Sequence, residues 1–153
     1  MTRRWLAVLF ALSACGSDPA ALLPADSIIG DTIPTSLTGT PGNAVRGELV
    51  FSDRDQGHCV LCHVVEGLQT PFQGNVGPDL TDIGSRLSDA QLRLRIVDYQ
   101  IVRPGTLMPS YYRKHDLYQV QKDYDGTPIL TAQQVEDLVS YLSQLEQDDA
   151  YDE

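Results

Sequence analysis

The sequence predicts an all-α fold, and three observations lead to that prediction. Apolar residues recur every three or four positions in several segments, as in helices that bury one face. Two of these segments begin with residues that form helix caps, and no stretch shows the sustained apolar–polar alternation of a strand. The length of 153 residues suggests one domain, and 42% hydrophobic and 21% charged residues are ordinary for a globular protein.

The folded domain is predicted to span residues 43–146. Its first helix covers residues 43–53, where the apolar positions follow a helical pattern. A second, short helix is expected to carry the close pair Cys59 and Cys62. Residues 67–84 are expected to form a loop, because they contain several helix breakers. These breakers are Pro71, Gly74, Gly77 and Pro78.

Two capping boxes mark the starts of the later helices. Ser88 and Gln91 begin a helix that is predicted to run to about Tyr99. Thr131 and Gln134 begin the last helix in the same way. The apolar residues of this last helix recur at three- and four-residue spacing, which places them on one face. They are Val135, Leu138, Val139, Leu142 and Leu145.

The N-terminus has the marks of a secretory signal rather than of the fold. Arg3 and Arg4 precede the apolar run Trp5–Leu12, which small residues follow. The run is too short to cross a bilayer as a helix, which needs about 20 residues. We therefore expect residues 1–14 to be a signal peptide and the mature chain to lie in the periplasm. A membrane anchor or an unstructured leader is the alternative.

Residues 12–15, Leu-Ser-Ala-Cys, resemble a bacterial lipoprotein box, in which the cysteine becomes the first mature residue and carries lipid on its sulfur. This resemblance predicts lipidation of Cys15, with cleavage without lipid as the alternative. Residues 15–42 are rich in Pro, Gly, Ser and Thr and are predicted to be a flexible linker, a tether with a reach of about 30 Å. The apolar pairs at 22–23 and 28–29 would also allow part of it to pack against the domain or a partner.

The chain is strongly acidic, with a formal net charge of −10. Removal of Arg3 and Arg4 with the leader takes the charge to −12. This balance argues against nucleic acid and anionic membrane surfaces as partners and favours partners with basic faces. Five of the eight residues from Glu146 to Glu153 are acidic, so we expect residues 147–153 to form a solvated acidic tail.

The segment Cys59-Val60-Leu61-Cys62-His63 is the C-x-x-C-H attachment signature of c-type haem. At this spacing both thiols can reach the two vinyl groups of one porphyrin as thioethers. The adjacent imidazole can then bind the iron beneath the same ring. The sequence therefore predicts one covalent haem c, attached through Cys59 and Cys62, with His63 as its proximal iron ligand.

Two other interpretations of the cysteine pair stay open. A zinc site would need two further good ligands, and the remaining histidines are His58, which is interpreted as a surface residue, and His115. A thioredoxin-like redox pair would need a βαβ setting, whereas this chain has a helical pattern. Because Cys15 belongs to the export signal, no cysteine is left for a disulfide.

Met108 is the candidate sixth ligand, because removal of the leader leaves no other methionine. It lies in the loop at 104–109, Pro-Gly-Thr-Leu-Met-Pro, 45 positions after His63. The two prolines stiffen this loop, and a thioether ligand raises the reduction potential of the iron. The alternatives are that Met108 fills a gap in the core, or that His115 is the ligand and lowers the potential.

These elements, in this order, resemble class I cytochromes c. That family has a first helix, the attachment motif, a Gly-Pro loop, a Met-Pro loop and a last helix, all packed around one covalent haem. The resemblance implies that Gly47 lies where the first and last helices cross, with Phe51 and Tyr141 packed beside it. It also implies that Pro78 and its loop support the orientation of His63.

A more specific resemblance runs from about Gly42 to Leu145 and is to the SoxX family, the small cytochrome subunits of SoxAX complexes in bacterial sulfur oxidation. Its Met-Pro-x-Tyr-Tyr segment is much more specific than C-x-x-C-H alone. Carried over residue by residue, it implies the same haem attachment and iron ligands as above. The N-terminus departs from the family, since many members look simply periplasmic and Cys15 indicates a tether. The resemblance is carried by FQGNVGP at 72–78, LRLRIVD at 92–98, PGTLMPSYY at 104–112 and LTAQQVED at 130–137.

The SoxX resemblance implies an electron-transfer subunit that supplies no catalytic residue. In that family a SoxA subunit, bound as a heterodimer, holds the catalytic haem. The complex couples thiosulfate oxidatively to a cysteine of the carrier SoxYZ, and the electrons pass to a downstream cytochrome or oxidase. The chain would then be a non-catalytic haem subunit of an L-cysteine S-thiosulfotransferase.

Arg93, Arg95 and Arg103 are candidate contacts with such a partner, with a solvated helix face as the alternative. Two other functions stay open. One is a free-standing periplasmic cytochrome c that shuttles electrons between respiratory complexes. The other is a haem sensor or gas-binding protein, which would need an open or labile sixth position.

Overall fold

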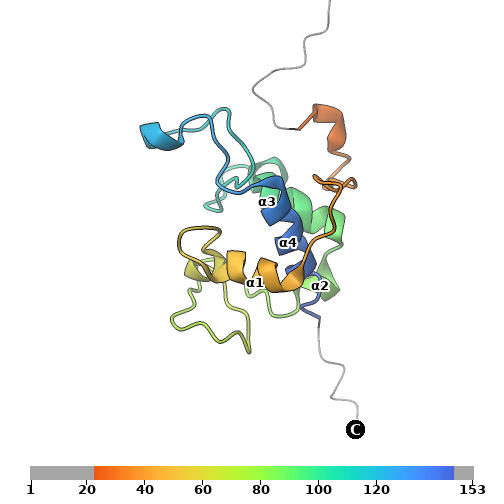
Figure 1. Ribbon diagram of the computed structural model, residues 1–153, viewed down its shortest axis with the longest axis vertical. Coiled ribbons are helices and arrows are strands. Elements are labelled where there is room, and N and C mark those ends of the chain that lie inside the picture. The colour runs from red at the N-terminus through yellow and green to blue at the C-terminus, as the bar shows by residue number, and fades with distance from the viewer. Residues whose placement is uncertain (1–22, 147–153) are drawn as a thin grey trace, which may run out of the picture.

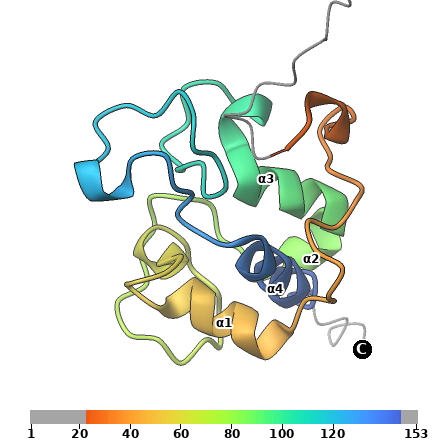
Figure 2. The same cartoon turned by 45° about the horizontal axis from the view of Figure 1, so that its top comes forward.

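The computed structural model describes residues 23–146, and this part of the chain is helical (Figures 1 and 2). Within it the only strand-like pairing is one isolated bridge, between Ile29 and Thr32. The predicted signal peptide, Cys15 and the acidic tail at 147–153 lie outside the described residues. No helix among residues 23–146 is long and apolar enough to cross a membrane. The elements are η1 (Ala25–Ser27), α1 (Ala44–Ser52), η2 (Cys59–Leu61), α2 (Ile83–Arg86), α3 (Asp89–Val102), η3 (Lys122–Tyr124) and α4 (Ala132–Leu142).

Helices α1 and α4 cross at a close contact around Gly47 (Figure 2). A Cβ atom at Gly47 would lie only 2.7 Å from the Cβ of Tyr141, so a larger residue would force the two helices apart. The rings of Phe51 and Tyr141 pack beside this contact, with centroids 5.5 Å apart and planes inclined by 57°. The predicted crossing is therefore confirmed, together with the three residues expected to form it.

The predicted caps explain where the helices begin. The side chains of Ser88 and Thr131 each form a complete capping box, with the glutamine three residues later. Helix α3 runs to Val102, three residues beyond the predicted end at Tyr99, but it is broken inside. Asp98 has an extended backbone, with φ −159° and ψ 90°, which kinks the helix before its last turn.

Residues 23–42 lie against α3 and α4, as the orange segment beside these helices in Figures 1 and 2 shows. Ile33 is only 1% exposed, and its N–H donates to Ala90 O at 2.9 Å. The N–H of Leu37 donates to Glu136 Oε1, also at 2.9 Å. The described part of the segment predicted as a flexible linker is therefore packed on the helices, and the folded body begins before residue 43.

Arg93 of α3 and Glu136 of α4 form a buried ion pair beneath this segment. Arg93 Nε and Nη2 donate to the two carboxylate oxygens at 2.8 and 2.9 Å, and both side chains are buried. The prediction that Arg93 contacts a partner is therefore wrong, because its charge is used inside the fold. Arg95 is partly buried, and its Nη2 lies 3.4 Å from Asp31 Oδ2. Arg103 is exposed.

Candidate functional site

The cysteine pair lies on a tight turn between α1 and the following loop. The N–H groups of Cys62 and His63 both donate to Cys59 O at 3.0 Å, which winds η2 into a single 3-10 turn. His58 enters the turn with a left-handed backbone, φ 46°. This winding brings the side chains of residues 59, 62 and 63 close together on one short piece of chain, as attachment to one porphyrin requires.

The two thiols are unpaired, and the Cys59 thiol is held in its protonated form. Burial raises the pKa of Cys59 to about 12, and the neighbouring Cys62 adds to this shift. A redox or nucleophilic cysteine has the opposite property, a lowered pKa that yields thiolate. Within residues 23–146, no three His, Cys, Asp or Glu side chains gather as a metal-binding group.

The imidazole of His63 is oriented by the loop that follows the cysteine turn. Its Nδ1 lies 2.8 Å from Pro78 O. Because a carbonyl only accepts, Nδ1 carries the proton and donates it, and Nε2 keeps its lone pair free for a metal ion. The support expected from the Pro78 loop therefore comes through a backbone oxygen.

The ring of His63 packs against the backbone of Gly77. A Cβ atom at Gly77 would lie 2.6 Å from His63 Nδ1 and 2.9 Å from Nε2, so the ring rests directly on the glycine backbone. The N–H of Gly77 donates to Cys62 O at 2.8 Å, and that of Gly74 donates to Val60 O at the same distance. The loop thus wraps the cysteine turn through main-chain bonds.

Met108 lies half-buried in the loop after α3. Burial raises the pKa of the Tyr111 phenol, and the nearby thiols of Cys59 and Cys62 raise it further. Tyr111, three positions after Met108, is thus within electrostatic range of both thiols. In Figures 1 and 2 the teal loop after α3 likewise faces the yellow turn η2.

The residues present fit a haem. One turn offers two thiols and one imidazole with a free Nε2. In the segment after Met108, Arg113 Nε and His115 Nδ1 are buried nitrogens with no hydrogen-bond partner in the described part of the chain. Buried polar atoms normally have partners, and the propionate groups of a haem are acceptors of the kind these two nitrogens lack.

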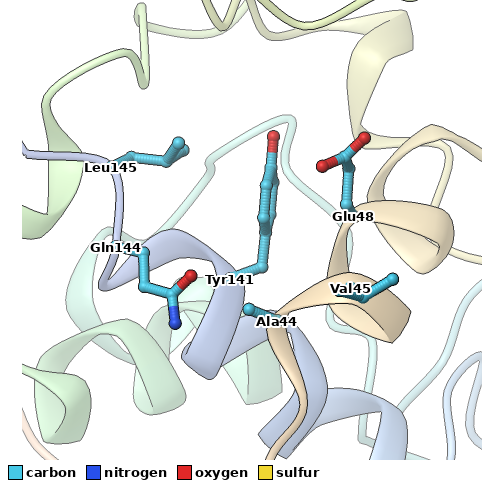
Figure 3. A pocket seen from close by; sticks show the side chains of 6 residues that line it. All are labelled: Ala44, Val45, Glu48, Tyr141, Gln144 and Leu145. Carbon is cyan, nitrogen blue, oxygen red and sulfur yellow. The ribbon is translucent and has the colours of Figure 1, made fainter.

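A small hollow lies between α1 and α4, and none of the predicted iron ligands lines it (Figure 3). Its volume is about 240 Å³, below the range of typical ligand pockets. Figure 3 shows the ring of Tyr141 at this hollow, with its hydroxyl on the same side as the Glu48 carboxylate. Burial raises the pKa of Tyr141 to about 12, and the Glu48 carboxylate adds to the shift. This hollow lacks the donor set of a cofactor site.

Three polar residues that support the Met108 loop were not predicted from the sequence. Asp98 is buried at the kink of α3 and binds Ser110 and Arg113 of the loop. These partners lie 12 and 15 positions away along the chain. No local pattern marks such a triad, although an acidic residue among the apolar positions of a buried helix is an available warning.

The comparisons with known proteins agree with this geometry. Residues 44–146 match the cytochrome c family model. A chain in the crystal structure of SoxXA from P. pantotrophus is 32% identical in sequence and superimposes with a TM-score of 0.73, covering 78% of this chain and 93% of that chain. No curated protein matches the sequence.

Proposed function

The chain belongs to the cytochrome c family, and from that premise we propose that it is the small electron-transfer subunit of a SoxXA-type complex. The observation that carries the proposal is the 32% identity to the SoxXA chain, which extends over 93% of that chain's length. A match over this length includes the segments of both proposed iron ligands, so the similarity is not limited to the C-x-x-C-H motif. The protein is an electron-transfer cytochrome with one covalent haem c. The iron of the haem takes up and releases one electron.

In this proposal each predicted residue has one task. Cys59 and Cys62 hold the haem as thioethers, and His63 binds the iron through Nε2 while Pro78 O fixes its tautomer. Met108 supplies the soft sixth ligand, which favours the reduced state and raises the potential. In this proposal the chain itself contributes no nucleophile or general base, since both cysteine sulfurs are used as thioethers.

The proposed partner is a SoxA-like subunit that passes on electrons from thiosulfate bound to a SoxYZ-like carrier. Large apolar side chains are exposed in the sequence segments that surround the two proposed iron ligands, and a permanent subunit interface buries such surface. These side chains are Leu61, Phe72, Val76 and Leu107. The electrons would then leave for a downstream cytochrome or oxidase.

A pull-down from the host grown on thiosulfate, with haem staining of the bound proteins, tests the partner. We expect a stoichiometric haem-bearing protein, and we expect Phe72→Ser to reduce its retention while the haem spectrum stays unchanged. Phe72 is 98% exposed, so this substitution leaves the core intact. Val45→Ser, on the exposed face of α1, is the matched control and should retain the partner. A redox-active protein that emerges alone would indicate the free-standing shuttle instead.

We also propose a periplasmic location, with a lipid on Cys15 as the tether. Residue 23 is the first that the structure describes, and it lies eight positions after Cys15. Eight extended residues span at most about 28 Å, so the tether would hold the haem domain close to the membrane surface. Mass spectrometry of the mature N-terminus decides this, because an unmodified terminus that begins elsewhere would rule out the tether.

A further inference from the structure

The kink in α3 has a side-chain cause. Neither glycine nor proline lies at the break, and the Asp98 carboxylate instead enters the hydrogen-bond ladder of the helix. The N–H of Gln100 donates to Asp98 Oδ1 at 3.1 Å, whereas in an unbroken helix it would bond to Ile96 O. Asp98 therefore acts as an internal cap for the last turn of α3.

The kink makes two helix carbonyls available to the loop that carries Met108. The N–H of Tyr111 donates to Ile96 O, and that of Tyr112 donates to Val97 O, both at 3.2 Å. An unbroken helix would use both carbonyls for its own next turn. The residues that directly follow the Met-Pro segment are thus bonded to the main chain at the break.

The Asp98 carboxylate binds the same loop a second time. It is 4% exposed; its Oδ1 accepts from Ser110 Oγ at 2.5 Å, and its Oδ2 accepts from Arg113 Nη1 at 2.8 Å. A buried carboxylate is costly unless several donors compensate it, so the loop and Asp98 are held in one arrangement. Ser110 lies two positions after Met108, a span of at most about 7 Å.

We infer that Asp98 is a positioning residue for the distal iron ligand, fixing the Met108 thioether through Ser110 and Arg113. The inference rests on the proposal that Met108 is the sixth ligand. A thioether binds ferric iron weakly, so its occupancy depends on how well the loop presents it. If the carboxylate is removed, the loop gains freedom and an external ligand competes more successfully for the iron.

The test is the affinity of the ferric holoprotein for imidazole, together with the far-red charge-transfer band of the sulfur–iron bond. We expect Asp98→Asn to raise the imidazole affinity by about tenfold or more and to weaken the band. Ser110→Ala removes one bond only and should act in the same direction by less. Asp89→Asn, an exposed carboxylate on the same helix, is the matched control and should resemble the wild type.

The outcomes separate this inference from the proposed function. Met108→Leu should abolish the band and set the upper limit of imidazole affinity. If Met108→Leu behaves so while Asp98→Asn and Ser110→Ala bind imidazole like the wild type, Asp98 has only a structural role and the inference fails. It fails equally if the two variants lower the melting temperature without changing the imidazole affinity. If Met108→Leu changes neither measurement, the ligand assignment itself fails, and the inference fails with it.

Discussion

The proximal and distal regions each hold one proposed iron ligand, but by different means. His63 is oriented by a backbone carbonyl 15 residues away and by contact with a glycine, and main-chain bonds from Gly74 and Gly77 join its loop to the cysteine turn. Met108 has one local bond, from its N–H to Thr106 Oγ1, and main-chain bonds join the residues that follow it to α3. Its loop is bound to α3 by the buried carboxylate of Asp98, which receives a hydroxyl and a guanidinium from the loop.

This difference indicates how each ligand can be lost. Main-chain bonds survive most substitutions, so the proximal region should fail only where a new side chain collides with the ring, as at Gly77. The distal region has main-chain bonds as well, but one buried side chain, Asp98, also binds two residues of the loop, so the loop should loosen when that group changes. A proximal ligand that is hard to remove and a distal ligand that is easier to displace suit a cytochrome whose haem must stay attached.

The largest expected effect comes from breaking the scaffold that both regions share. Glu136→Gln leaves the Arg93 guanidinium buried without its counter-charge, and removal of one partner from a buried pair costs about 3–5 kcal/mol. We expect urea unfolding followed at the haem to lose both axial ligands in one transition, at a lower midpoint. Glu66→Gln, at an exposed position, is the control and should stay near the wild-type midpoint. Loss of one ligand well before the other would show that the two regions do not share this support.

A smaller and more local effect is expected at Gly77. The Cβ of Gly77→Ala would lie 2.6 Å from His63 Nδ1, so the ring or the loop must move, at a cost of about 2–3 kcal/mol. We expect the His63 bond to Pro78 O to be lost and the haem spectrum to change while the helix content is kept. Gly39→Ala is the matched control, because a Cβ at that position has no neighbour within 4 Å. A native spectrum in Gly77→Ala would mean that His63 does not need the glycine contact.

The same contrast explains how much of the molecule could be predicted from the sequence. The capping boxes, the contact at Gly47 and the cysteine turn depend on residues close in sequence or on a recurrent family pattern, and they were predicted. The packing of residues 23–42 was only an alternative, and its contacts at Ile33 and Leu37 were not predicted, because they are made with partners on α3 and α4 far along the chain. The role of Asp98 was missed for the same reason, since a buried carboxylate is defined by donors that only the fold supplies.

The smallest expected effect is a pH dependence of the shared scaffold. Burial alone would raise the pKa of Glu136, but the hydrogen bonds from Arg93 and the Leu37 N–H outweigh it, so the pKa lies below the ordinary 4.5. A lowered pKa in the folded state gives stability that is fully present above pH 4.5 and is lost as the pH falls through the folded value. We expect the urea midpoint to fall more steeply below pH 4.5 in the wild type than in Glu136→Gln, because the variant has no titratable carboxyl group at this position. Equal slopes would show that Glu136 titrates at its ordinary value, and that the buried pair stabilises both ligand regions no more at neutral pH than in acid.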